Sequence, residues 1–111
     1  MKTEFFSALA EPSRLQIVDL LHEGPLTVGE IADRLSMRQP QASKHLRVLY
    51  EAGVVEFHAE ANRRIYKLRS EPFKALDFWL KNYRDLWEEK FNHLDDYLQG
   101  LQEREPANND Q

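Results

Sequence analysis

Residues 39–55 read QPQASKHLRVLYEAGVV, and the rest of the chain is organised around them. Pro40 suits the first turn of a helix, where backbone N–H groups lack intrahelical partners. Gly53 suits the left-handed residue just beyond a helix end. An inward face is predicted by apolar residues at four- and three-residue spacing, namely Ala42, Leu46 and Leu49. The stretch is therefore predicted to form a helix over about residues 39–52 that leads into a strand.

The outward face of this helix carries side chains that DNA recognition uses. A Gln amide pairs bidentately with adenine and an Arg guanidinium with guanine, whereas Ser and Lys reach phosphates. The partial positive charge at a helix N-terminus also favours an anion. The outward residues are Gln39, Gln41, Ser43, Lys44 and Arg47. The pattern favours a DNA-recognition helix, and an ordinary solvated helix face is the alternative.

The charge distribution supports the same interpretation, although the net charge of the chain is -4. Residues 36–69 carry seven basic and three acidic side chains, whereas the rest of the chain carries eight basic and sixteen acidic ones. Basic charge is thus concentrated in the middle third. Such segregation directs a polyanion to one face of the protein and repels it from the others.

A shorter helix is predicted directly before the recognition helix. Thr27 is expected to cap it, and Glu30, three residues on, can reach back to the Thr27 N–H to complete a capping box. This helix spans residues 28–35, and only Ser36-Met37-Arg38 separate it from the next. Two helices joined by so short a turn form a helix-turn-helix, here over about residues 28–52.

Two more helices are predicted upstream. The first, over residues 2–10, ends at Glu11-Pro12-Ser13-Arg14, because proline disfavours helix at the residue before it and can open a new one. The second runs from Pro12 to His22. A broadly buried face is predicted for it from Leu15, Ile17, Val18, Leu20 and Leu21.

The period changes after Gly53, and alternation predicts a β-hairpin, or wing, over about residues 54–69. Val55 and Phe57 would face one side of a strand and Glu56 and His58 the other, and Tyr66 and Leu68 repeat the alternation. At the tip Asn62 tolerates a positive φ, and two arginines follow it, Arg63 and Arg64. These arginines are predicted to enter a flanking minor groove or to meet phosphates, and solubilising charge is the alternative.

A long helix is predicted over about residues 72–104, with apolar residues at alternating four- and three-residue steps apart from Lys90. This apolar surface is wider than one 111-residue core would absorb, so a subunit interface is predicted, and an intramolecular helical core is the alternative. The predicted interface residues are Phe5, Phe6, Leu9, Leu76, Leu80, Tyr83, Trp87, Leu94 and Leu98. A third interpretation is an apolar effector pocket lined by Trp79, Tyr83 and Trp87.

The composition bounds the remaining classes. A chain of 111 residues has room for one domain, expected over residues 1–105, with a disordered polar tail over residues 106–111. The chain has no cysteine, which excludes disulfides and thiolate metal sites. Neither a signal peptide nor a membrane span is predicted, so a soluble cytoplasmic protein is expected. Ser43 and His45 stand two residues apart on a helix and do not face each other, so they form no catalytic triad. The sequence also has no phosphate-binding glycine loop, paired-carboxylate motif or HExxH, so neither an enzyme nor a cofactor is expected.

Taken in order, EPSRLQIVDLL, VGEIADRL, QPQASKHLRVLYEAGVV and RRIYKLR resemble the ArsR/SmtB family of winged-helix bacterial repressors, over about residues 5–69. The resemblance implies a mainly α fold with a small β-hairpin, dimerising through its first and last helices. It implies a homodimer whose recognition helices enter successive major grooves of a palindromic operator. The family's DNA-facing positions fall at Arg38, Gln39, Gln41, Ser43, Lys44, His45 and Arg47, with wing basics at Arg63 and Arg64.

The chain departs from the family at several positions. Arg38 stands where Ser or Thr often caps the recognition helix; Ser36 is an alternative cap, but Pro40 would then delete an N–H that the helix needs. The usual wing-tip glycine is missing. The Cys pair of metal-sensing members is replaced by Thr27 and Gly29, which places the chain nearest a cysteine-free branch. In the last helix Glu89, His93 and Asp96 lie at helical spacing, and solvated surface charge is favoured there over a weak metal site.

The sequence therefore predicts a homodimeric transcriptional repressor that binds double-stranded operator DNA, and an effector of unknown identity is a further candidate partner. His45 is either a phosphate-facing donor or a helix-packing residue. A winged helix that serves as a protein-interaction module without nucleic acid is the alternative function. The basic middle third argues against that alternative, because such a module has no reason to possess it.

Overall fold

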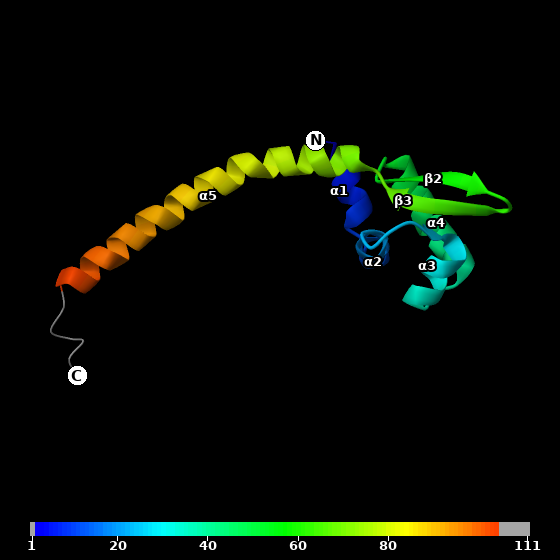
Figure 1. Cartoon of the computed structure of the whole chain (residues 1–111), viewed down its shortest axis with the longest axis horizontal. Coiled ribbons are helices and arrows are strands. Elements are labelled where there is room, and N and C mark those ends of the chain that lie inside the picture. Colours follow the sequence, from blue (N-terminus) through cyan, green and yellow to red (C-terminus); the bar gives the residue numbers. More distant parts are fainter. Residues whose placement is uncertain (1, 105–111) are drawn as a thin grey trace. The chain divides into compact units, whose positions relative to one another are not determined.

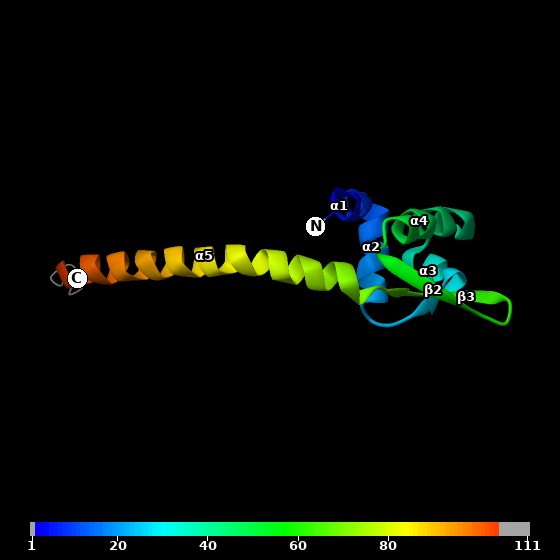
Figure 2. The same ribbon diagram turned by 90° about the horizontal axis from the view of Figure 1, so that it is seen from above.

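The computed structural model describes residues 2–104 (Figure 1). Its elements are, in chain order, α1 (Thr3–Leu9), α2 (Pro12–Leu21), β1 (Leu26–Thr27), α3 (Val28–Leu35), α4 (Gln39–Glu51), β2 (Val55–Glu60), β3 (Arg63–Leu68) and α5 (Ser70–Arg104). These residues form two units, one up to Ala75 and one from Leu76 onward. Within the first unit the helices α1 to α4 stand beside a small sheet (Figure 2). The arrangement is the predicted winged helix-turn-helix.

The capping box at the start of α3 is confirmed. The backbone N–H of Thr27 donates to Glu30 Oε1 at 2.9 Å, and the Glu30 N–H donates to Thr27 Oγ1 at 3.2 Å. The hydrogen bond from the Thr27 backbone, followed by that from its side chain, lowers the pKa of the Glu30 carboxyl. The helix ends at Ser36, whose φ of 54° is left-handed, so Ser36 closes α3 and is not the cap of α4.

Helix α4 begins after Arg38, as predicted, and no side chain caps its N-terminus. Pro40 lies in its first turn, and Gly53 follows the helix with a φ of 77°. Its inward residues are buried as predicted, namely Ala42, Leu46 and Leu49. The recognition helix therefore has a fixed inner face and an outer face that takes no part in the core.

The core of the first unit lies between α1 to α4 and the sheet. The largest fully buried side chains are Ile17, Ile31, Leu46, Leu49, Val54 and Val55. The prediction that Leu15 belongs to this core is wrong, because its side chain is 45% exposed. Helix α2 buries Ile17, Val18, Leu20 and Leu21 instead, and Leu15 falls outside that stripe.

The sheet has three antiparallel strands in the order β1-β3-β2. The predicted hairpin is confirmed, and its register places Phe57 opposite Tyr66 and Val55 opposite Leu68. The short strand β1 was not predicted; it pairs Leu26 with Tyr66. At the tip the residue with positive φ is Ala61, at 55°, so the assignment of that role to Asn62 is wrong.

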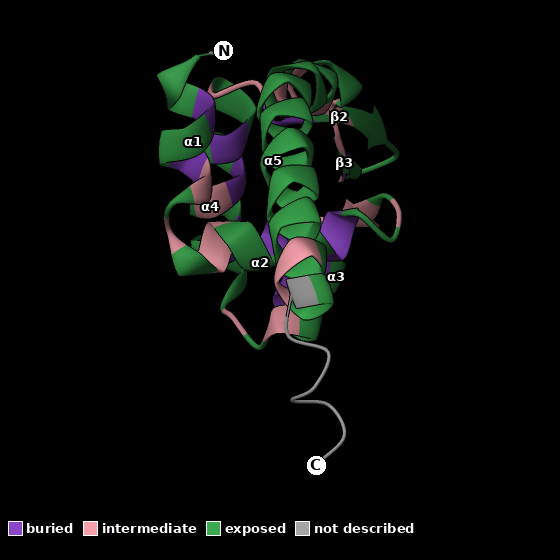
Figure 3. Cartoon of the chain, turned by 90° about the vertical axis from the view of Figure 1, so that its left-hand side faces the viewer, coloured by how far each residue is buried: buried purple, intermediate pink, exposed green. Residues whose placement is uncertain are grey.

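Helix α5 begins at Ser70, two residues earlier than predicted. Figure 3 colours nearly all of the described part of this helix as exposed. The exposed large apolar residues of α5 are Phe78, Trp79, Leu80, Tyr83, Leu86, Trp87, Phe91, Leu94, Tyr97 and Leu98. The predicted single domain over residues 1–105 stays a prediction, and the predicted disordered tail, residues 106–111, lies outside the described residues.

Candidate nucleic-acid interface

The outer face of α4 presents the predicted DNA-facing side chains to solvent. All but one of the residues predicted on this helix and at its cap are exposed, namely Arg38, Gln39, Gln41, Ser43, Lys44 and Arg47. They share one element because the apolar spacing of α4 turns its other side to the core. A single rigid helix therefore offers amide, hydroxyl and basic groups together, which is the set that reads bases and holds phosphates.

His45 is the exception. Its side chain is only 17% exposed, and its Nδ1 lies 3.8 Å from Glu11 Oε2, at the start of α2. The structure thus supports the packing alternative for His45 and not the phosphate-facing one. Helical spacing alone left the choice open, because His45 stands at the boundary between the inner and outer faces.

Arg47 is held by a neighbour on its own helix. Its Nε lies 3.1 Å from Glu51 Oε1, one turn further on, while both side chains remain mostly exposed. Such an i,i+4 pair is weak in water, about 0.3–0.5 kcal/mol. The guanidinium is therefore available to DNA, at the cost of releasing Glu51.

A groove of about 530 Å³ separates α4 from the wing. Ser43 and Arg47 line it from the helix, and Arg64 lines it from β3. The Arg64 guanidinium carbon lies 4.7 Å from the centroid of the Phe57 ring, a cation–π contact. Phe57 packs against Tyr50 of α4 and Tyr66 of β3, with ring centroids 5.1 and 5.2 Å apart. The two arginines thus face one groove from opposite elements.

A second hollow, of about 350 Å³, lies where the wing tip approaches the starts of α3 and α4. Gln39 lines it together with Arg63 and Arg64 of the wing. The structure therefore brings the two wing arginines next to the recognition helix. Arg64 is held by the Phe57 ring, which packs against Tyr50 of α4. Sequence analysis missed Phe57 and Tyr50 as site residues, because its only signal for them was an aromatic residue on each of the two elements.

The predicted interface residues differ in exposure. Phe6 is 41% exposed, and those of α5 from Leu80 onward are exposed too, whereas Leu9 and Leu76 are half-buried. Phe5 is 3% exposed, because its ring packs edge-on against Phe6 and Phe73 inside the first unit. Phe5 thus belongs to the protomer's core.

Among residues 2–104 no three His, Asp or Glu side chains lie together as metal ligands, so Glu89, His93 and Asp96 are not brought together.

Comparisons of the sequence and the fold with known proteins identify the family of this chain. A family model described as "Helix-turn-helix domain" matches residues 9–56. The crystal structure of an ArsR family transcriptional regulator is 35% identical and superimposes with a TM-score of 0.68, covering 78% of this chain and 94% of the other. The chain belongs to the ArsR family. This ArsR-family protein is accordingly a DNA-binding transcriptional regulator, and α4 with its wing is its nucleic-acid interface candidate.

Two further relatives of this ArsR-family chain bear on its role. The transcriptional repressor SdpR of Bacillus subtilis is 32% identical over 78 residues, which cover 70% of this chain and 87% of SdpR. A Mycobacterium bovis fragment, described as a homodimeric winged helix-turn-helix DNA-binding domain, is 34% identical with a TM-score of 0.63. The match covers 75% of this chain and 77% of the fragment.

In the described part of this chain, no helix has the length and apolar character to cross a bilayer.

Proposed function

We propose that this protein is a homodimeric repressor that binds a palindromic operator, with α4 in the major groove and the wing on the adjacent minor groove or phosphates. The observation that carries the proposal is the groove between α4 and the wing, with Arg47 on one side and Arg64 on the other. Two cations that face each other across a groove suit a DNA strand, with Arg64 toward its phosphates and Arg47 toward its base edges.

The roles of the individual side chains follow from their chemistry and position. Gln39, Gln41 and Arg47 read base edges, because amides and guanidinium groups make bidentate pairs there. Phosphates are held by Arg38, Ser43, Lys44, Arg63 and Arg64, all of which are exposed. His45 is left out of this set because its ring points inward, toward Glu11. Phosphate contacts fix the register of the helix, and base contacts set the preferred sequence.

The second copy of the chain is proposed to cover the exposed apolar face of α5. Trp87 is 53% exposed and Leu94 is 50% exposed, and they stand one heptad apart with further apolar residues at heptad steps. A two-fold dimer places two recognition helices on one side of the duplex, with half-sites about 10 bp apart or a multiple of that.

The apolar effector pocket at Trp79, Tyr83 and Trp87 stays a prediction, and its test is a change in tryptophan fluorescence when an apolar ligand is added.

The test is a fluorescence-anisotropy titration against operator and scrambled DNA at two salt concentrations. Gln41→Ala should relax the preference for operator over scrambled DNA, because it removes a base contact. Lys44→Ala should weaken binding to both DNAs alike and lower the salt slope by about 1, because it removes one phosphate contact. Equal effects of the two substitutions on both DNAs would contradict the assigned roles, and wild-type protein that does not distinguish the two DNAs would contradict the function.

A further inference from the structure

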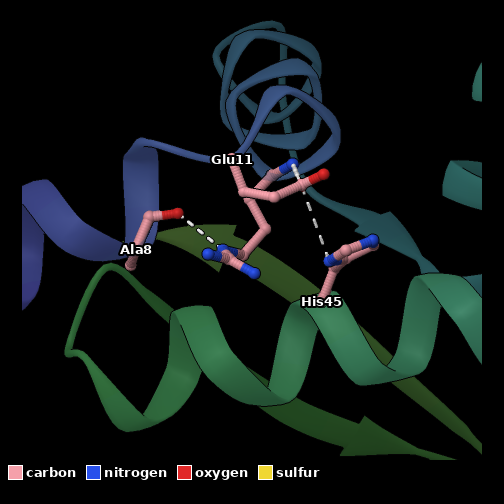
Figure 4. A network of polar contacts seen from close by, with 4 residues as sticks. Ala8, Glu11 and His45 are labelled. Carbon is pink, nitrogen blue, oxygen red and sulfur yellow. Dashed lines mark hydrogen bonds and ion pairs between the residues drawn. The ribbon is translucent and has the colours of Figure 1, made fainter.

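One carboxylate, that of Glu11, contacts two helices of the first unit. Glu11 Oε2 accepts a hydrogen bond from the Arg14 backbone N–H at 2.9 Å and so caps α2. The same oxygen lies 3.8 Å from Nδ1 of His45 on α4. Arg14 Nε in turn donates to the Ala8 carbonyl oxygen at 2.6 Å, at the end of α1. Figure 4 shows the His45 ring directed toward Glu11 across the space between the two helices.

The strength of the contact between Glu11 and His45 depends on charge. A separation of 3.8 Å is too long for a hydrogen bond, so a neutral imidazole gains little from the carboxylate. An imidazolium at the same place is attracted to it, and the low exposure of the His45 ring, 17%, limits screening by water. Protonation of the ring therefore strengthens this contact.

The position of His45 gives this contact a bearing on DNA. His45 directly follows Lys44 and stands one helical turn after Gln41, and both of those side chains are on the exposed face. A contact on the inner side of a helix fixes its rotation about its own axis, and hence the direction of the outer side chains. Operator recognition is sensitive to such placement, because bidentate base contacts tolerate only small displacements.

We infer that Glu11 and His45 are positioning residues for the recognition helix, and that protonation of His45 strengthens operator binding. The inference rests on the proposed function of α4. It also gives a role to the Glu-Pro-Ser-Arg segment at residues 11–14: Glu11 holds α4, Pro12 opens α2, and Arg14 fastens α1.

Other charged groups around His45 leave Glu11 as its partner. Helices α1, α2 and α3 and strand β2 pack against α4. Among residues 2–104 none but Glu11 brings a carboxylate within 4.0 Å of the His45 ring nitrogens. Helix α2 carries two further charged residues: Arg14, whose Nε is engaged by the Ala8 carbonyl, and Asp19, whose side chain is exposed. Glu4 of α1 and Glu51 line a hollow with Arg14 and Val48, one turn further along α4.

The experiment measures the ratio of operator to scrambled-DNA affinity between pH 5.5 and 8 for the full chain and two variants. Glu11→Gln keeps an oxygen that can accept from the Arg14 N–H, so the α2 cap is retained while the charge facing His45 is lost. His45→Gln removes the titrating ring. The wild-type ratio should rise about twofold to fivefold as the pH falls, since an incompletely buried ion pair is worth no more than that, and both variants should flatten the profile. Circular dichroism at pH 8 checks that both variants are folded.

A matched control separates this contact from general histidine protonation. His58 lies 3.8 Å from Glu60 through its Nε2, the same kind of pair at the same distance, but on the exposed wing. His58→Gln should keep the wild-type profile of the affinity ratio. A wild-type slope that persists in His45→Gln or Glu11→Gln would overturn the inference while leaving the proposed function intact. A wild-type protein without operator preference at any pH would overturn the proposed function, and the inference with it.

Discussion

Phe57 is predicted to contribute to DNA binding through Arg64. The guanidinium carbon of Arg64 lies 4.7 Å from the centroid of the Phe57 ring, which is itself packed between Tyr50 and Tyr66. The ring thus holds the arginine over the groove before DNA arrives and lowers the entropy that is lost on contact. Phe57→Leu keeps an apolar side chain in the half-buried position but removes the π face.

The magnitude follows from the exposure of the pair. A cation–π contact at an exposed site is worth about 0.5–1 kcal/mol, and about 1.4 kcal/mol corresponds to a tenfold change in affinity. Phe57→Leu should therefore weaken operator binding about twofold to fivefold. Phe57→Tyr retains an aromatic face and should bind within a factor of about two of the wild type.

A double-mutant cycle by fluorescence anisotropy isolates the effect. Arg64→Ala should itself weaken binding, and in that background Phe57→Leu should cause no further loss, because the contact is already gone. Thermal unfolding of all four proteins controls for general destabilisation. An equal loss from Phe57→Leu in both backgrounds would refute the reasoning, since the ring would then act on the wing as a whole and not on Arg64.

Three other predictions follow from the same unit. Glu51→Gln should raise operator affinity about twofold by releasing Arg47, whose Nε lies 3.1 Å from the carboxylate; unchanged affinity by anisotropy would count against it. Ala61→Gly should raise the free energy of unfolding by up to about 1 kcal/mol in urea titrations, because Ala61 has a φ of 55° that glycine adopts without strain. The Glu30 carboxyl has a pKa held below its ordinary value by hydrogen bonds from Thr27, so it stabilises the fold above about pH 4.5 and loses that effect as the pH falls further. Glu30→Gln should therefore show a smaller fall in melting temperature between pH 7 and pH 3 than the wild type, and an identical fall would contradict the assignment.

The helix-turn-helix could be predicted because its determinants are local. The spacing of Leu46 and Leu49, the capping pair at Thr27 and the glycine after α4 each act within one or two helical turns. The pairing of Leu26 with Tyr66 is different, since it joins residues forty positions apart and depends on the whole unit being folded. A two-residue strand has no periodicity of its own from which it could be recognised.

Two further features, at the wing tip and on α4, could not be assigned from the sequence alone. Sequence preference assigned the positive φ to Asn62, but the hairpin places it at Ala61, because the pairing of Glu60 with Arg63 fixes which turn position is left-handed. His45 similarly stands at the edge of the helix's apolar stripe, where spacing permits either direction. Only the position of Glu11 on a different helix decides it.

In the proposed homodimer, the exposed apolar face of α5 contributes both to the stability of the fold and to operator binding. Trp87, Leu94 and Leu98 are about half exposed in a single chain, and leaving such side chains in water forgoes the burial energy that a small fold needs. A second copy supplies that burial and also the second recognition helix. The stability of the protein should then depend on its concentration, and operator binding should weaken with the same concentration dependence, because one interface serves both. Each protomer alone would retain a complete α4 and wing but could contact only one half-site.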